Sequence, residues 1–138
     1  MNINIQNGEI YLNDRLSILP GQRVKAALLS FGDTLSLKLE NGAFAQYETE
    51  KLFIDERPAI VRLTFRNDVI YYLSIYFLSG EIGWSSTTQS VQEELKVAND
   101  EWLQRKIEQA PPYIRPWGKV ESLYDPRSAI SEIVVTYQ

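Results

Sequence analysis

The stretch that decides the fold runs from Ala59 to Leu78 and reads Ala-Ile-Val-Arg-Leu-Thr-Phe-Arg-Asn-Asp-Val-Ile-Tyr-Tyr-Leu-Ser-Ile-Tyr-Phe-Leu. In its first half, apolar and polar side chains alternate, which is the period-2 pattern of a strand with one buried face. Asn67-Asp68 follows, and both residue types tolerate the positive φ angles of a tight turn. The stretch therefore predicts a β-hairpin.

The second strand of this hairpin is apolar on both sides. By alternation, one face carries Val69, Tyr71, Leu73, Ile75 and Phe77. The opposite face carries Ile70, Tyr72, Tyr76 and Leu78. Because such a pattern is typical of strands that are covered on both faces, we expect this strand to lie in the middle of a sheet.

Two Asn-Gly pairs precede the hairpin, and Asn-Gly is the strongest short sequence signal for a tight β-turn. Asn7-Gly8 predicts an opening hairpin within residues 2–13, and Asn41-Gly42 predicts a second antiparallel pair within residues 35–54. At the other end of the chain, residues 117–137 have the pattern of a closing hairpin.

Two segments have the composition of helices. Residues 23–31 predict a short helix that Gly32 ends, and residues 89–110 predict a long helix that Pro111-Pro112 stops. At about 100° per residue, the long helix has an apolar stripe centred on Trp102. Its other members are Val91, Leu95 and Ala98, with Leu103 and Ile107 to one side. This stripe is expected to pack on the sheet.

These elements predict one α+β domain over residues 1–138. We expect a meandering antiparallel β-sheet of roughly six to eight strands, with the long C-terminal-half helix packed on one face and a short N-terminal helix. The first residues lack the basic and apolar regions of a signal peptide, and no run of about 20 apolar residues suggests a membrane span. We therefore expect a cytoplasmic protein with no membrane partner.

The charge of the chain bears on its partners. A net charge of −4 and a pI near 4.9 disfavour nucleic acid, since such binding depends on clustered Lys and Arg. The expected partner is another protein, with a basic surface. Oligomeric state stays open between monomer and homodimer.

The residue types that are missing limit the chemistry. With no histidine and no cysteine, the chain cannot build a His-based triad, a thiolate nucleophile or a zinc site of the His or Cys type. A carboxylate pair is the remaining route to hydrolysis, but no spacing selects one among the 18 acidic residues. We therefore predict a protein that is not an enzyme, with no catalytic residues, no metal ligands and no cofactor.

The first candidate binding surface is the acidic side of the long helix. Its members are Glu93, Glu94, Val97, Asp100, Glu101 and Glu108. A solvated helix face is the ordinary explanation for such a cluster. The alternative is a docking surface, on which the carboxylates steer a basic partner and an exposed Val97 adds an apolar contact.

The second candidate is one face of the central hairpin, where Arg62 lies beside Tyr72 and Tyr76, flanked by Thr64, Arg66 and Ser74. Tyrosine and arginine are enriched in binding hot spots. The alternative is that the tyrosines are core residues with satisfied hydroxyls. The sequence leaves both open, because a change in strand register changes which residues lie opposite each other.

Two further segments have a functional and a structural interpretation. The loop Gly80–Ser86 is a candidate anion cradle, and Tyr113–Gly118 places a Trp beside an Arg as ligand-stacking pairs do. For both, the structural interpretation is favoured. The loop then caps the helix with Trp84 tucked inward, and the second segment is a bend that fills the core.

The last 40 residues or so of the chain resemble a class of small acidic bacterial proteins. The resemblance lies in Asp100-Glu-Trp-Leu103, a Pro-Tyr pair, Trp117-Gly118, Tyr124-Asp125-Pro126 and the ending Ile133–Tyr137. This class includes immunity proteins, which neutralise a toxin encoded beside them. The resemblance implies a non-enzymatic module that binds a cognate toxin. The alternatives are a subunit or accessory factor of a larger assembly, and a small-molecule-binding domain.

Overall fold

The computed structural model describes residues 1–78, 89–127 and 130–138. Its helices are α1 (Val24–Phe31), the 3₁₀ turn η1 (Gly32–Thr34) and α2 (Gln89–Ile107). Its strands are β1 (Asn2–Ile3), β2 (Ile10–Tyr11), β3 (Ser17–Ile18), β4 (Leu35–Asn41), β5 (Phe44–Thr49), β6 (Leu52–Ile54), β7 (Arg57–Arg66), β8 (Val69–Phe77), β9 (Tyr113–Arg115), β10 (Gly118–Asp125) and β11 (Ile130–Tyr137).

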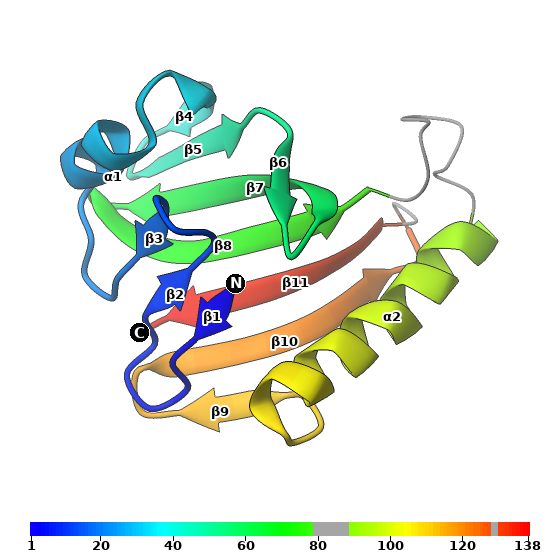
Figure 1. The fold of residues 1–138 in the computed structure, drawn as a ribbon. Helices are drawn as coiled ribbons and strands as arrows, with labels where there is room; N and C mark the ends of the chain where they lie inside the picture. Colours follow the sequence, from blue (N-terminus) through cyan, green and yellow to red (C-terminus); the bar gives the residue numbers. More distant parts are fainter. Residues whose placement is uncertain (79–88, 128–129) are drawn as a thin grey trace.

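The strands form two antiparallel sheets. The large sheet has the order β4-β5-β7-β8-β11-β10-β9, with β6 paired to β7, and the small sheet has the order β1-β2-β3. The small sheet and the two helices pack on one face of the large sheet, and the hydrophobic core lies between these layers (Figure 1). The predicted α+β class is confirmed, with the long helix on one face.

The central hairpin forms as predicted. β7 and β8 pair from Ala59 opposite Phe77 to Arg66 opposite Val69. Asn67 and Asp68 make the turn with φ angles of 51° and 70°, the left-handed values that a two-residue hairpin turn needs. β8 is the middle strand of the large sheet, as its composition suggested.

A β-bulge at Tyr71 changes which side chains share a face at the start of β8. The predicted assignment of residues to the two faces is wrong there. Thr64 pairs with Tyr72 and Phe65 with Ile70, so Tyr71 has no partner on β7. A bulge reverses the alternation of side chains beyond it. As a result Ile70 is buried in the core, and the Tyr71 ring lies beside that of Tyr72, at 5.4 Å between centroids.

The two faces of β8 are covered unequally, which corrects the expectation that both are buried. Leu73, Ile75 and Phe77 are fully buried on the core face. On the other face, Tyr72 and Tyr76 are half-buried. The described helices and the small sheet all lie on the core face, so this side of the sheet keeps an exposed surface.

The long helix is rotated relative to the predicted stripe. Leu95, Trp102 and Leu103 are buried as expected, but Val91 and Ala98 are only half-buried. Gln92 and Asn99 are buried in their place.

The physical cause of this rotation is a polar contact with β11. Gln92 Oε1 accepts a hydrogen bond from the Ser131 amide at 2.8 Å, and the Ser131 hydroxyl donates to the Gln92 carbonyl oxygen. Burying these groups is favourable only when they are paired in this way.

Trp102 anchors α2 to the rest of the fold. Its side chain is 4% exposed, and its ring packs against Phe77 at 5.3 Å in a T-shaped arrangement. Its indole Nε1 donates to Asp55 Oδ2 at 3.1 Å, and Lys106 Nζ lies 2.7 Å from the same carboxylate. Partial desolvation raises the pKa of Asp55, but hydrogen bonds from Lys106 and the amino group of Met1 outweigh it and hold that pKa below its usual range.

The two ends of the chain follow the prediction with two differences. β1 and β2 pair as the opening hairpin, but residues 4–9 connect them, so Asn7-Gly8 is not a two-residue turn. β10 and β11 form the closing hairpin. The short strand β9, which pairs with the start of β10, was not predicted.

Candidate partner-binding surfaces

The sheet-face surface consists of Arg62, Arg66, Tyr71, Tyr72 and Tyr76, on the face of β7 and β8 opposite the core. Arg62 pairs with Ser74 and lies on this face, where its Nη2 is 2.9 Å from Glu48 Oε2. Its guanidinium also lies over the Tyr76 ring, at 5.4 Å from the centroid. The structure therefore brings the three predicted residues, Arg62, Tyr72 and Tyr76, onto one face.

Tyr76 is the most constrained member of this surface. Burial raises the pKa of its hydroxyl well above the ordinary value, and a hydrogen bond to Glu132 together with the negative charge of that carboxylate raises it further. The hydroxyl is consequently a neutral hydrogen-bonding group at physiological pH. Tyr76 and Arg62 therefore place a hydroxyl and a guanidinium group beside Tyr72 on this face.

Sequence reasoning missed two aromatic members of this region, Tyr71 and Phe44. The bulge turns Tyr71 onto the sheet-face surface, where Arg66 lies 4.8 Å above its ring. Phe44, which pairs with Arg66 and is 44% exposed, lies 6.2 Å from Tyr71 between ring centroids. The position of a bulge depends on pairing with another strand, so no local pattern places these rings here.

The same face is hollowed between β8, β11 and β10. An open groove of about 330 Å³ runs beside the tyrosines. Its lining residues are Tyr71, Tyr72, Ser74, Lys119, Glu121, Leu123, Glu132, Val134 and Thr136. Aromatic residues and arginine are enriched in protein–protein interfaces, so this face is a candidate partner-binding surface.

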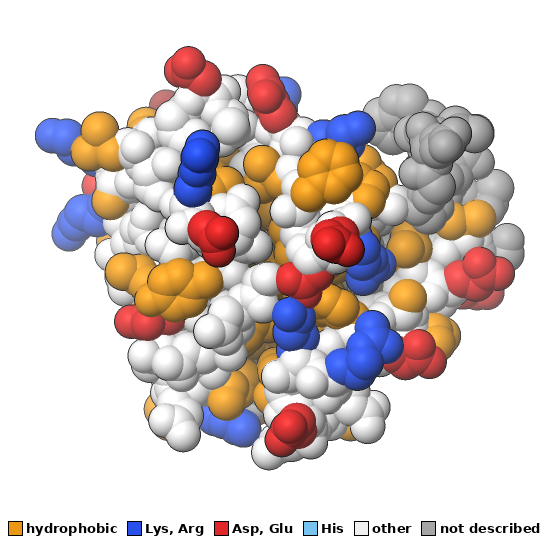
Figure 2. Space-filling view, viewed as in Figure 1, with side chains coloured by type: hydrophobic (Ala, Val, Ile, Leu, Met, Phe, Trp, Pro, Cys, Tyr) orange, Lys and Arg blue, Asp and Glu red, His pale blue; other side chains and the backbone are white. Residues whose placement is uncertain are grey.

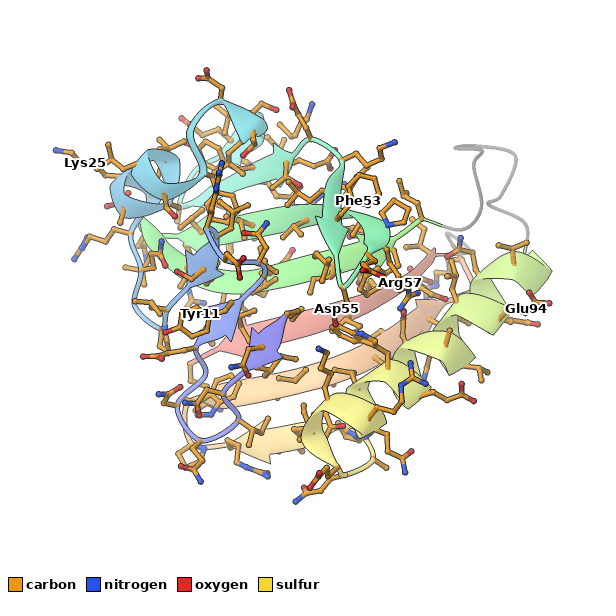
Figure 3. The ribbon with its side chains drawn as sticks, in the orientation of Figure 1. Tyr11, Lys25, Phe53, Asp55, Arg57 and Glu94 are labelled. Carbon is orange, nitrogen blue, oxygen red and sulfur yellow. The ribbon has the colours of Figure 1, made fainter. Side chains whose placement is uncertain are left out.

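The acidic helix surface consists of Glu93, Glu94, Val97 and Glu101, on the side of α2 that faces away from the sheet. All four residues are exposed, and Val97 is 56% exposed. Glu94 points away from the sheet in Figure 3, and acidic side chains follow the outer side of α2 in Figure 2. These residues are accessible to a partner.

Two predicted members of the acidic cluster differ from their companions. Asp100 is half-buried, and both of its oxygens accept hydrogen bonds from Lys96 Nζ, at 2.9 and 2.7 Å. Glu108 lies beyond the end of α2 with a φ angle of 63°, and its amide closes the last turn on the Gln104 carbonyl. Placing Glu108 on the helix was wrong, because the chain leaves helical geometry there, before the two prolines.

The other two segments give different outcomes. Tyr113–Gly118 has its structural interpretation confirmed, since Tyr113 is buried and Trp117 Nε1 donates to the Ile5 carbonyl at 2.8 Å. The Gly80–Ser86 loop, including Trp84, lies outside the described residues.

Among the described residues, no three acidic side chains gather closely enough to hold a metal ion. Neither described helix combines the length and apolar character that crossing a membrane requires.

Comparison with known proteins gives one structural likeness. No protein-family model matches the chain, and no curated protein matches its sequence. Its fold is similar to a chain in the solved structure of "Rhs1-CT in complex with cognate immunity protein RhsI1", with a TM-score of 0.65 and 12% sequence identity. The alignment covers 100% of this chain and 87% of the other. At this identity the likeness establishes the fold.

Proposed function

We propose that this protein is an immunity protein, which binds a cognate toxin in a 1:1 complex and blocks its activity. It works as a binding module rather than as an enzyme. The toxin presents a basic surface, complementary to the net charge of −4. The protein acts in the cytoplasm, where such a toxin would reach its target.

The observation that carries this proposal is the likeness of fold over the whole chain to a chain of a solved complex that contains an immunity protein. Each chain of such a complex binds a protein partner, so the likeness supports a binding role. The exposed sheet-face surface supports it independently, because a monomer gains nothing in stability from leaving three tyrosines partly exposed.

The proposal predicts which gene lies beside the gene for this protein. A toxin gene should lie beside the gene for this protein, and its purified toxin domain should bind this protein tightly with a calorimetric stoichiometry of 1:1. A subunit of a larger assembly would have neither the neighbouring toxin gene nor this binding.

Charge reversal on the acidic helix surface is expected to slow association. The double variant Glu94→Lys, Glu101→Lys should associate with the toxin domain several-fold more slowly at low ionic strength, because long-range attraction steers the encounter. Thermal stability should stay nearly unchanged, since both side chains are solvated.

The matched control is Glu40→Lys, Glu50→Lys, which changes the net charge equally at two exposed sites on and beside β4. Stopped-flow mixing at two salt concentrations measures both variants. Equal association rates for the two double variants would remove the acidic helix surface as the docking site.

Truncation on the sheet-face surface is expected to change dissociation instead. Tyr72→Ala removes a half-buried ring from the centre of the surface and should raise the dissociation rate about tenfold or more, as loss of a hot-spot aromatic does. Tyr72→Phe keeps the ring and should stay close to the parent. Tyr11→Ala, at an exposed tyrosine on β2, is the control for a general loss of aromatic surface. A Tyr72→Ala variant that is fully folded and dissociates at the parental rate would place the contact elsewhere.

A further inference from the structure

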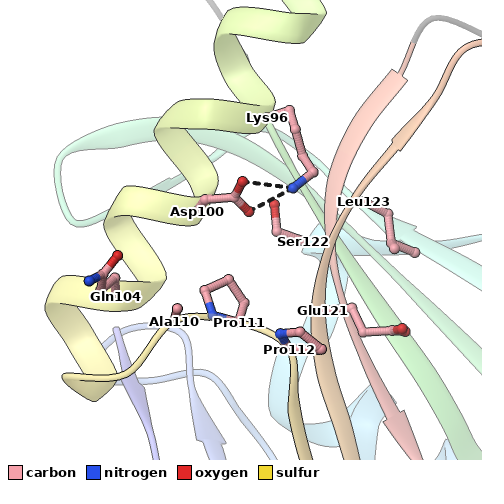
Figure 4. Close-up of a pocket in the computed structure, with 9 residues that line it drawn as sticks. All are labelled: Lys96, Asp100, Gln104, Ala110, Pro111, Pro112, Glu121, Ser122 and Leu123. Atoms are coloured by element: carbon pink, nitrogen blue, oxygen red, sulfur yellow. Dashed lines mark hydrogen bonds and ion pairs between the residues drawn. The ribbon is translucent and has the colours of Figure 1, made fainter.

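Two hollows of the surface differ in how their charges are paired. The cleft between α2 and β10, of about 360 Å³, holds Lys96 and Asp100, and Lys96 Nζ donates to both Asp100 oxygens at 2.9 and 2.7 Å (Figure 4). Because these two charges offset each other inside the chain, the cleft has little attraction for a charged partner. The groove on the sheet-face surface, of about 330 Å³, lies next to a basic group that is not paired in this way.

This basic group is Arg66, the last residue of β7. Two other basic groups of the same face pair with carboxylates: Arg62 Nη2 lies 2.9 Å from Glu48, and Lys119 Nζ lies 3.4 Å from Glu121. Arg66 is exposed, and within the described part of the chain it forms no ion pair and donates no hydrogen bond. Its N–H groups are therefore available to a partner.

Aromatic rings hold Arg66 at this position. The central carbon of its guanidinium lies 4.8 Å from the centroid of the Tyr71 ring, and Tyr71 lines the groove. Phe44, which pairs with Arg66 across β5 and β7, is 44% exposed, and its ring centroid lies 6.2 Å from that of Tyr71. A side chain that is already held against a ring loses less freedom when a partner binds it.

The carboxylate nearest to Arg66 along the chain is engaged elsewhere. Asp68, two residues further on, lies 3.3 Å from Arg23 Nη1. The positive charge of Arg66 is thus exposed next to two aromatic rings and beside a groove. Arginine and tyrosine at such a position are typical of binding hot spots.

The unpaired charge selects the chemistry of the occupant. A guanidinium presents parallel N–H donors that match the two oxygens of a carboxylate or of a phosphate. The phosphates of a nucleic acid are disfavoured, because the net charge of −4 repels a polyanion. A carboxylate on a protein surface fits both the guanidinium and the adjoining rings.

We infer that Arg66, Tyr71 and Phe44 form the docking site for an aspartate or glutamate side chain of the toxin, whose carboxylate pairs with Arg66 while neighbouring apolar atoms contact the two rings. This assignment rests on the proposed function and adds one acidic contact to a toxin surface that is basic as a whole. A single pair of opposite sign at a defined point fixes the orientation of the two proteins.

Neutralising Arg66 separates this assignment from the effect of net charge. Arg66→Gln changes the net charge from −4 to −5, and long-range attraction alone would then leave binding to a basic toxin unchanged or make it tighter. The assignment predicts the opposite. The dissociation constant for the purified toxin domain encoded beside this protein should rise about tenfold or more, chiefly through faster dissociation. Isothermal calorimetry and stopped-flow mixing measure the two quantities.

Two further variants complete this comparison. Lys25→Gln, at an exposed site on α1, makes the same change in net charge and should not weaken binding. Arg66→Lys keeps the charge but not the parallel donors, and it should recover only part of the lost affinity. All three variants should keep the circular dichroism spectrum of the parent, because both positions are exposed.

A double-mutant cycle identifies the carboxylate on the toxin. The exposed Asp and Glu residues of the toxin domain are replaced one at a time by Asn and Gln. One of these changes should weaken binding to the unaltered protein about tenfold and have little further effect on binding to Arg66→Gln, because the two groups share one interaction. The same cycle with Arg66→Lys gives a second estimate of the coupling.

The outcomes separate this assignment from the proposed function. Tight binding by the parent together with a parental dissociation constant for Arg66→Gln would overturn the assignment and leave the immunity function standing. A cycle in which no acidic residue of the toxin couples to Arg66 would do the same. Absence of any binding by the unaltered protein would overturn both. A dimer of the protein alone that Arg66→Gln abolishes would identify a second copy of the chain as the occupant and would also overturn the assignment.

Discussion

Replacing Trp102 with Ala should lower the free energy of unfolding by about 3–5 kcal/mol, as deletion of a large core side chain does. The ring is 4% exposed, packs against Phe77 and donates a hydrogen bond to Asp55, so the substitution removes packing and a polar contact together. Trp102 joins α2 to β8 and to the β6–β7 turn, and its loss should loosen the whole helix. The measurement is urea unfolding followed by circular dichroism.

Trp102→Phe is the matched control, because it keeps an aromatic ring in the site and loses the hydrogen bond from Nε1. A hydrogen bond to a charged group is worth about 1.5–3 kcal/mol, less than the loss expected for Trp102→Ala, so this variant should be the more stable of the two. A Trp102→Ala protein with the urea midpoint of the parent would show that α2 does not pack on the sheet through this face.

Gly118→Ala should also be strongly destabilising. Gly118 has a φ angle of 150°, and a Cβ atom added to it would lie 1.9 Å from the Thr136 carbonyl oxygen. Since this neighbour is backbone in the paired strand β11, the β10–β11 ladder itself would have to shift. Overpacking and backbone strain together should cost about 3 kcal/mol or more in unfolding free energy.

Gly42→Ala serves as the control for Gly118→Ala. Gly42 has a φ angle of 59° and nothing within 4 Å of an added Cβ, so only the left-handed backbone opposes the change. Its cost should be about 1–2 kcal/mol. Thermal or urea unfolding of the two variants measures the difference, and equal losses would contradict the close approach of β10 to Thr136.

The central hairpin was predictable because its determinants are local. Turn residues at Asn67-Asp68 and the alternation in β7 specify a hairpin without information from the rest of the chain. The same holds for the existence of the long helix, although it ends at Ile107 and not at the two prolines. The fold class follows from such elements in order, and the structure confirms it.

The candidate surfaces were less predictable, because they depend on contacts between distant segments. The bulge that brings Tyr71 beside Tyr72 is set by pairing across β7 and β8. The rotation of α2 is set by Gln92 meeting Ser131, which lies 39 residues further along the chain. Composition and periodicity carry no signal for these two features.

Protection of growing cells against the neighbouring toxin is the most direct measurement of the proposed function. Cells that express the toxin domain alone should stop growing, and co-expression of this protein should restore growth. A variant that combines Tyr72→Ala with Glu94→Lys and Glu101→Lys should accumulate as a folded protein and protect less well. Growth arrest that persists despite full expression of the unaltered, folded protein would contradict the immunity function.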